Sequence, residues 1–442
     1  MLERLFKLKS LGTNVRIETL AGITTFMTMA YIIFVNPAIL STTGMDFGAV
    51  MVATCISSSI ATLIMGIYAN YPIALAPGMG INAYFAYTVC GIMHIPWQTA
   101  LGAVFISGVL FILLTVSRIR EWIVNAVPDV LKDGTACGIG LLIAFIGLKE
   151  SGIVTSHPAT FVTLGNLISG PTIIAIIGIL ITAALLARRV RGAILLGMVI
   201  TAILGIPLGV VKYQGIISMP PSIESTFFKL DIPGALSLGL LSVIFVFFFV
   251  DLFDNVGTFV GVGKLGGFIK DGKMPRANKV LMSDAIGCTI GSICGTSTVT
   301  SYIESASGIS QGGKSGLASV ITALLFLLAL FFSPLANMIG GGYEITKGVF
   351  IHPVTAPALI IVGSMMTTII THIDWKDYSN AIPAFLTIML MPLSFSIANG
   401  LAIGFISFAA IKLLSGKGKE VNWFVYTLAV LFILRFIFLG SH

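Results

Sequence analysis

Charged residues are scarce in this chain. Only 10% of its 442 residues are Asp, Glu, Lys or Arg, whereas a soluble domain carries roughly 25%. Hydrophobic residues make up 56% of the sequence, and the mean hydropathy is +1.02. No soluble core could bury this much apolar surface, so the composition predicts a polytopic membrane protein in a lipid bilayer. The net charge of +7 comes from basic residues scattered at segment ends. They set the orientation in the membrane and do not predict a nucleic-acid partner.

Cysteine and catalytic motifs are also sparse. The five cysteines lie in apolar surroundings, their number is odd, and no CxxC spacing occurs. We therefore expect them to pack in the interior, with no disulfide, no bound metal and no cofactor. The histidines at predicted segment ends, such as His352, suggest no ligand role. The first 16 residues are charged and precede an apolar run long enough to span, so no cleavable signal peptide is expected.

Long apolar runs dominate the rest of the chain, and windows of about 17–25 residues predict membrane spans. They lie at 18–40, 48–70, 97–117, 172–188, 192–211, 235–262, 315–338, 353–372, 399–415 and 422–440. Shorter or interrupted candidates lie at 79–91, 132–149, 279–295, 302–313 and 380–395. The sequence thus predicts about fourteen transmembrane segments, of which the last three are hard to apportion. Basic clusters place the N-terminus in the cytoplasm, and a plasma or inner membrane is the expected location.

A proline-bearing loop at 212–233 divides the chain into two halves. Seven predicted crossings precede this loop, which places it outside the cytoplasm. The second half would then enter the membrane with the opposite polarity, as in an inverted repeat. We therefore expect a first repeat over 1–211, an extracytoplasmic linker over 212–233 and a second repeat over 234–442.

Both halves contain an interrupted apolar segment. Residues 70–87 read as an extended stretch, a Pro-Gly break and a short helix. Residues 295–316 are polar and Gly-rich, although they lie between two apolar runs. When the two segments are aligned, Asn82 corresponds to Glu304. Matched interrupted segments in two halves are the best sequence indication of a transport site.

Glu304 is the first candidate for that site. Residues 296–300 favour an extended strand, and the Ser-x-x-Glu pattern from Ser301 to Glu304 predicts that a helix begins there. The carboxylate could serve only as the capping partner of Ser301. An acidic side chain inside a membrane is costly and usually functional, which favours a substrate or proton site.

Two further acids lie in the apolar run 235–262. Asp251, Asp254 and Thr258 are spaced i, i+3 and i+7, so they share one face of a helix. A glycine closely follows Asp254 and would let a ligand approach, so Asp254 is the predicted ligand or proton site. Asp251 is the predicted structural partner of a neighbouring hydroxyl. Asp284 is expected near the cytoplasmic end of its span, where water would solvate it.

Asn82 completes the polar set. It lies in the first short helix, where Gly78 and Gly80 allow close approach of the backbone and the free N–H groups of the helix start can face a ligand. The alternative is an amide that is hydrogen-bonded between helices. The aromatic candidates for a stacking face are Phe26, Tyr84, Phe85 and Tyr302.

Three motifs resemble those of a known family. APGMGINAYF at 76–85, VDLFDNVGTFVGV at 250–262 and TSYIESASGISQGGKSGL at 300–317 are similar to the AzgA-like purine permeases. These are a branch of the nucleobase:cation symporters, related to the uracil and xanthine permeases, and the likeness covers essentially the whole chain. The resemblance implies an all-α polytopic membrane protein with two inverted seven-helix repeats. It also implies a core domain, a gate domain, and short strands before half-helices 3 and 10.

The resemblance also implies site residues. By position, the family's two acids fall on Asp254 and Glu304, and its third-helix glycine and asparagine fall on Gly80 and Asn82. The uracil and xanthine permeases carry a Gln-His-like pair in the first helix, where this chain has threonines at 24–25. That departure favours the AzgA-like branch.

The expected function is import of a purine nucleobase by alternating access, coupled to protons. Guanine presents two adjacent N–H donors, and a carboxylate of Glu304 or Asp254 can accept both, while Asn82 would donate to O6 or N7. Hypoxanthine fits the same arrangement, and adenine is the less favoured alternative. Burial favours the neutral form of a carboxyl group, so Asp254 and Glu304 are expected to share base binding and proton coupling. Thr258, Tyr302 and Phe26 are the remaining predicted contacts. The sequence does not decide whether protons or sodium ions are coupled to transport, or whether the protein forms a homodimer.

Two other classes of protein share some of these features. A sulfate-type anion transporter of the same fold would place two half-helix starts against an anion. Two acids without a clear cation suit a neutral substrate better. An intramembrane aspartyl protease also needs paired acids, but the sequence contains no GxGD, HExxH or Asp-rich prenyltransferase motif.

Overall fold

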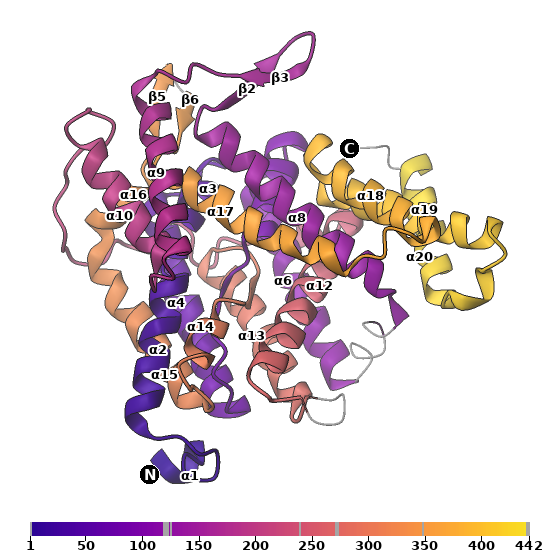
Figure 1. The fold of residues 1–442 in the computed structure, drawn as a ribbon, viewed down its shortest axis with the longest axis horizontal. Helices are drawn as coiled ribbons and strands as arrows, with labels where there is room; N and C mark the ends of the chain where they lie inside the picture. Colours follow the sequence, from indigo (N-terminus) through magenta and orange to yellow (C-terminus); the bar gives the residue numbers. More distant parts are fainter. Residues whose placement is uncertain are drawn as a thin grey trace.

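The computed structural model describes residues 2–117, 123, 126–237, 240–269, 274–346 and 349–438. In these ranges the chain is mostly helical (Figure 1). Seven helical stretches of the described residues are long and apolar enough to cross a membrane, and four shorter apolar helices accompany them. The prediction of a multi-pass membrane protein is confirmed. Residues 439–442, at the end of the predicted second repeat, lie outside the described residues.

The first half of the chain contains most of the helices that its apolar runs predict. Its helices are α1 (Leu2–Phe6), α2 (Val15–Met29), α3 (Ile32–Ser41), α4 (Phe47–Ile64), α5 (Met79–Ala83), α6 (Trp97–Val116), α8 (Asp129–Glu150), α9 (Gly170–Ala187) and α10 (Ala193–Gly205). The π-helical segments η1 (Met65–Ala69) and η2 (Tyr84–Ile92) extend α4 and α5. The strands are β1 (Leu75–Pro77), β2 (Val154–His157) and β3 (Phe161–Leu164).

The second half follows a similar order. Its helices are α11 (Ile232–Ala235), α12 (Leu241–Leu265), α13 (Ala277–Cys294), α14 (Ser305–Ile309), α15 (Gly316–Ala329), α16 (Ser333–Gly340), α17 (Ala356–Met366), α18 (Tyr378–Leu393), α19 (Ile397–Leu414) and α20 (Trp423–Phe438). The 3-10 turns are η4 (Leu330–Phe332), η5 (Thr367–His372) and η6 (Gly418–Glu420). The strands are β4 (Val299–Ser301), β5 (Tyr343–Thr346) and β6 (Val349–Ile351).

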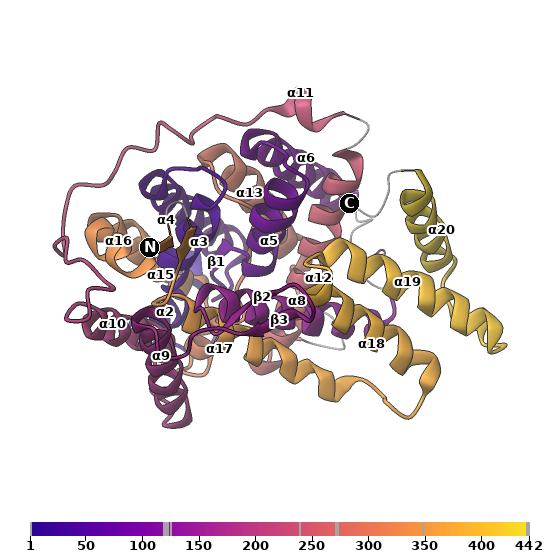
Figure 2. The same cartoon turned by 90° about the horizontal axis from the view of Figure 1, so that it is seen from above.

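The helices pack in two groups, which Figure 2 shows side by side. The core group contains α2 to α6 and α12 to α16, and the gate group contains α8 to α10 and α17 to α20. Each group therefore takes consecutive helices from both halves of the chain. This is the arrangement that a core domain and a gate domain built from two repeats require. The exact repeat and linker boundaries stay a prediction.

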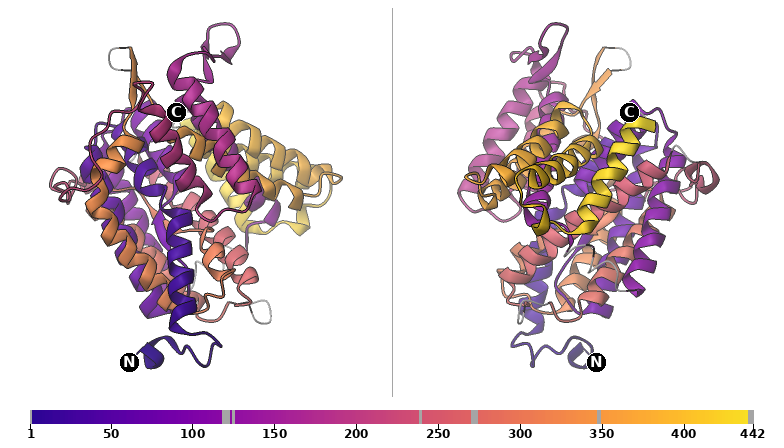
Figure 3. Two further views of the ribbon diagram at one scale, coloured as in Figure 1. Left: turned by 60° about the vertical axis from the view of Figure 1, so that its left-hand side comes forward. Right: turned by 90° about the vertical axis from the view of Figure 1, so that its right-hand side faces the viewer.

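The two ends of the molecule differ. The β2–β3 and β5–β6 hairpins lie at one end, called here the hairpin face, and the N-terminus lies at the opposite end, the N-terminal face (Figure 3). The segment between α10 and α11, which contains most of the predicted linker, runs along the periphery of the molecule (Figure 2). Its Ser218 bonds to the Phe331 carbonyl and to the Ser333 hydroxyl, so it is fastened to the core group.

The two interrupted segments meet in the core group. Strands β1 and β4 pair antiparallel, with Ala76 opposite Thr300. The short strands before the half-helices are therefore confirmed. The predicted helix start at Ser301 was wrong, because Ser301 is the last residue of β4 and α14 begins at Ser305. The amide and the hydroxyl of Ser301 both donate to Asn255 Oδ1, so this serine is not available to cap a helix.

Candidate functional site

The strand pair β1–β4 places the starts of α5 and α14 next to each other. The Gly78 amide donates to the Thr298 carbonyl at 2.9 Å, and the Tyr302 amide donates to the Ala74 carbonyl at 3.0 Å. Helix α12 packs against α5, β4 and α14. Side chains from one face of α12 therefore lie beside both half-helix starts, and each half of the chain contributes to the same site.

Glu304 occupies the N-cap position of α14 and is half-buried. Its side chain makes no capping bond to the α14 backbone. Instead, its Oε1 accepts a 2.6 Å hydrogen bond from the Tyr31 hydroxyl, which lies at the break between α2 and α3. The interpretation that this carboxylate only caps its own helix is therefore wrong. Its backbone carbonyl also accepts a bond from the Thr28 hydroxyl, which holds α14 against α2.

Asp254 is half-buried on α12 and faces the start of α5. Its Oδ2 lies 3.5 Å from the position that a Cβ on Gly78 would occupy, and Thr300 Cγ2 lies 2.6 Å from that position. Only glycine fits at residue 78, because any side chain would collide with Thr300 there. Asp254 also interacts electrostatically with Glu304 and Asp284. The two predicted acids thus lie on neighbouring elements, because α12 packs against α14.

Asn82 is fully buried on α5, where its Oδ1 accepts a hydrogen bond from the Ser297 hydroxyl. Within the described part of the chain, its Nδ2 has no hydrogen-bond partner. A buried amide donor without a partner is costly. Ser297 belongs to the segment that leads into β4, so Asn82 joins the two interrupted segments, and both N–H donors of its amide nitrogen are left for a ligand.

Other predicted site residues mainly support the surrounding structure. A Cβ on Gly80 would lie 2.5 Å from Ile139 Cγ2, so Gly80 allows α5 to pack against α8. The Tyr302 hydroxyl donates to the Pro77 carbonyl at 2.5 Å and ties β4 to β1. Phe26 packs edge-on against Phe326, with ring centroids 5.3 Å apart. Thr258 is buried on α12. Their contact with a substrate stays a prediction.

A buried polar network under the site was missed in the sequence. The Asn255 amide nitrogen donates to the carboxylates of Asp251 and Asp284, each at 2.9 Å. The amide oxygen accepts from Ser301, as described above, so Asn255 joins α12, α13 and β4. Asp251 has a structural partner in the Asn255 amide, and the neighbouring hydroxyl expected as its partner stays a prediction. The prediction that water solvates Asp284 was wrong, because α13 packs against α4 and α6 and buries this side chain completely.

Tyr31 was missed as well. It is only 1% exposed, and nothing in its sequence surroundings distinguishes it from the other aromatic residues of an apolar run. The doublet of Asp254 and Asn255 was a usable signal for Asn255, since an amide next to an intramembrane acid is rarely without a polar partner.

The chemistry of the site follows from its groups. Two carboxylates accept hydrogen bonds, and the Asn82 amide donates one. Asp254 interacts with the carboxylates of Asp284 and Glu304. This arrangement suits a neutral ligand with N–H donors better than an anion. No cluster of three or more potential metal-binding side chains occurs among the described residues.

Solved structures with a similar fold are membrane transporters. The transmembrane domain of the cyanobacterial bicarbonate transporter BicA aligns with a TM-score of 0.63 at 15% identity, covering 88% of this chain and 97% of that domain. SLC26A9 aligns with a TM-score of 0.61 at 11% identity, covering 94% of this chain and 68% of that one. The murine Slc26a9 anion transporter aligns with a TM-score of 0.60 at 12% identity, covering 94% of this chain and 71% of that one. At such identities the likeness concerns the fold alone. It confirms the predicted class, a helical membrane protein with two inverted repeats.

Sequence comparison defines the family. The permease family model that represents xanthine and uracil permeases matches residues 16–403, and the chain belongs to this family. The putative permease MJ0326 of Methanocaldococcus jannaschii is 58% identical, with 99% of each chain covered. The adenine permease AdeP of Escherichia coli is 44% identical, covering 100% of this chain and 97% of AdeP. The guanine/hypoxanthine permease PbuG of Bacillus subtilis is also 44% identical, covering 98% and 99%. The resemblance of the three motifs is confirmed.

Proposed function

We propose that this chain imports a purine nucleobase by alternating access and couples the import to protons. The two acids Asp254 and Glu304, which interact electrostatically, and the unpartnered amide nitrogen of Asn82 in the same core group carry this proposal. The names of the relatives AdeP and PbuG support a purine as the substrate. Both acids and the amide come from segments that pack around the antiparallel pair of β1 and β4.

The base would be recognised along one edge. Guanine carries N1–H and an exocyclic amine side by side, and one carboxylate accepts two parallel hydrogen bonds. Hypoxanthine keeps N1–H beside a carbonyl, so it can use one carboxylate oxygen and the Asn82 amide. Adenine has an acceptor at N1 and would need a protonated acid in this place. The arrangement therefore favours the oxopurines.

Proton coupling would use the same acids. A carboxyl group removed from water favours its neutral form, and two neighbouring carboxylates cannot easily both be charged. A proton from outside would thus bind with the base, and both would leave on the inner side. Sodium is the alternative coupling ion, and the experiment below separates the two.

We further propose that the N-terminal face lies in the cytoplasm of a cell whose plasma or inner membrane holds the protein. The basic clusters at segment ends support this orientation. The hairpin face would then be the outer face.

The test is uptake of labelled guanine, hypoxanthine and adenine into liposomes that contain the purified protein. We expect an inward proton gradient to drive accumulation of guanine and hypoxanthine, and a sodium gradient at equal pH on both sides to have no effect. Unlabelled hypoxanthine should block the uptake, and excess sulfate or bicarbonate should not. Accumulation of an anion without any purine uptake would overturn the proposal, and a response only to sodium would overturn proton coupling.

A further inference from the structure

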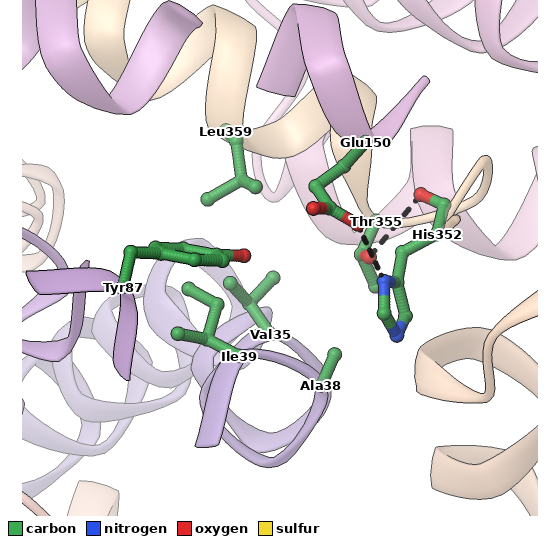
Figure 4. Close-up of a pocket in the computed structure, with 8 residues that line it drawn as sticks. All are labelled: Val35, Ala38, Ile39, Tyr87, Glu150, His352, Thr355 and Leu359. Carbon is green, nitrogen blue, oxygen red and sulfur yellow. Dashed lines mark hydrogen bonds and ion pairs between the residues drawn. The ribbon is translucent and has the colours of Figure 1, made fainter. Parts of the chain in front are cut away.

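A small pocket lies between the core and gate groups, away from the site described above. Figure 4 shows its lining, which includes Val35 and Ile39 from α3, Tyr87 from η2, Glu150 from the end of α8, and His352 just before α17. Three of these side chains are titratable, and the proposed site uses none of them. Most of the residues that line the pocket are buried, so the core and gate groups are in close contact here.

Glu150 and His352 form a buried pair within the gate group. The Nδ1 of His352 lies 2.8 Å from Glu150 Oε2, and the side chains are only 10% and 8% exposed. The His352 amide also donates to the Glu150 carbonyl at 2.9 Å. The pair joins the end of α8 to the start of α17, which come from different halves of the chain. Removing one member of such a buried pair leaves the other without its partner.

Tyr87 approaches this pair from the core group. Its hydroxyl points toward the Glu150 carboxylate (Figure 4), and the two side chains interact. Lys149 Nζ lies 5.6 Å from the centre of the Tyr87 ring. One residue further along, the Thr88 hydroxyl donates to the Phe395 carbonyl in the turn between α18 and α19. The first residues after α5 thus contact the gate group at two points.

The pocket lies on the hairpin side of the candidate site. Helix α3 starts at the break that holds Tyr31, the partner of Glu304, and Val35 and Ile39 follow one and two turns later. Because α2 begins near the N-terminus, α3 runs from the site toward the hairpin face. Tyr87 likewise follows Asn82 along the helix formed by α5 and η2.

Exposed residues lie on the opposite side of the site. Ile303, next to Glu304, is 51% exposed, and its Cδ1 lies 3.7 Å from the Cβ position of the exposed Gly261. Gly261 lies toward the end of α12. In the loop that follows α12, the Pro275 carbonyl accepts a hydrogen bond from the Tyr71 hydroxyl. The neighbouring Asn70 bonds to the Phe6 carbonyl of α1, so this loop belongs to the N-terminal face.

We propose that Tyr87 and the Glu150–His352 pair close the hairpin end of the substrate pathway, and that this contact breaks when the site opens to the hairpin face. The inference rests on the proposed transport function. The Glu150–His352 pair would hold α8 and α17 of the gate group together, and Tyr87 of the core group would contact this pair in the closed state. The three are positioning residues of the transport cycle and do not touch the substrate.

The test measures accessibility with a thiol reagent that cannot cross membranes, in sealed vesicles of known sidedness. The five native cysteines are first replaced. One reporter is then introduced per protein, either Ala38→Cys, in the pocket wall, or Ile303→Cys, at the exposed position next to Glu304. We expect Tyr87→Phe and Glu150→Gln each to raise labelling of the first reporter from the hairpin face on the order of tenfold, since each change removes the interaction between Tyr87 and Glu150. Labelling of the second reporter from the N-terminal face should fall.

Glu224→Gln, in the exposed linker, is the matched control and should change neither rate. If labelling rises at residue 38 and falls at residue 303, the population has shifted from a conformation open to the N-terminal face to one open to the hairpin face, which supports the proposal. If the labelling rate rose at residue 38 alone, the structure would have loosened only locally, and the proposal would be overturned. Tyr87→Phe keeps the ring and removes only the hydroxyl. Unchanged labelling rates in this variant would also overturn the proposal. Labelling needs no substrate, so the result is independent of whether the transported molecule is a purine.

Discussion

Tyr31 donates a 2.6 Å hydrogen bond to the carboxylate of Glu304, across 273 residues of sequence. The bond joins the break between α2 and α3 to the start of α14. It therefore fixes the direction of an acid whose own helix does not hold it. The proposed substrate site depends on this orientation, because a carboxylate that rotates freely would not present its oxygens to a flat base in a constant geometry.

Replacing Tyr31 by phenylalanine tests that relationship. The variant keeps the ring and removes the hydroxyl, so the site loses one charge-assisted hydrogen bond, worth about 1.5–3 kcal/mol. We expect the apparent affinity for hypoxanthine to fall about tenfold, with the protein still present in the membrane. Initial uptake rates over a range of base concentrations give this value. Wild-type affinity in this variant would show that the bond does not orient the acid for binding.

Each of the two acids is required in this account. We expect Glu304→Gln and Asp254→Asn each to abolish uptake or reduce it severely, because either change removes an acceptor for the base and a carrier for the proton. Uptake is compared at equal membrane content with Glu224→Gln, which should behave as wild type. Near-normal accumulation in either variant would remove that residue from the site.

Asn82 supplies the donor in the proposed complex. In Asn82→Ala the base loses one neutral hydrogen bond, worth about 1 kcal/mol, so its affinity should fall about fivefold. Asn82→Asp replaces the donor by a third acceptor and should be worse than alanine. Competition of unlabelled hypoxanthine against labelled guanine measures both variants. If the aspartate variant bound the base as tightly as wild type, Asn82 would not be the donor.

Asn255 has a structural role. Its amide bridges two buried carboxylates and holds Ser301, so Asn255→Ala leaves several polar groups without that partner. We expect a loss of about 2–4 kcal/mol in the free energy of unfolding, and a midpoint of thermal unfolding several degrees lower. The exposed Asn278→Ala is the control. An unchanged unfolding midpoint would contradict the role given to this network.

Much of the fold could be predicted because membranes restrict the choices. Apolar runs define helices in a bilayer, and the interrupted runs at 70–87 and 295–316 predicted an extended stretch before each short helix. The antiparallel pairing of these stretches as β1 and β4 was not predicted. The helix start after β4 could not be predicted from its capping pattern. The serine of that pattern is engaged by Asn255, a contact between segments 46 residues apart, and local sequence signals do not contain such contacts.

The site was predicted in part for the same reason. Acids in apolar runs are conspicuous, so Asp254 and Glu304 could be proposed as site residues from the sequence. Tyr31 and Asn255 were not found, because a phenol or an amide in an apolar run is ordinary until its partner is known. The burial of Asp284 was missed because it depends on how α13 packs between two other helices.

The most direct test is an experimental structure of the protein with hypoxanthine bound. The account predicts density for the base between Asp254 and Glu304, with one carboxylate within hydrogen-bond distance of N1 and the Asn82 amide nitrogen within reach of O6 or N7. Density for the base elsewhere in the molecule, with these three side chains contacting only protein, would contradict it.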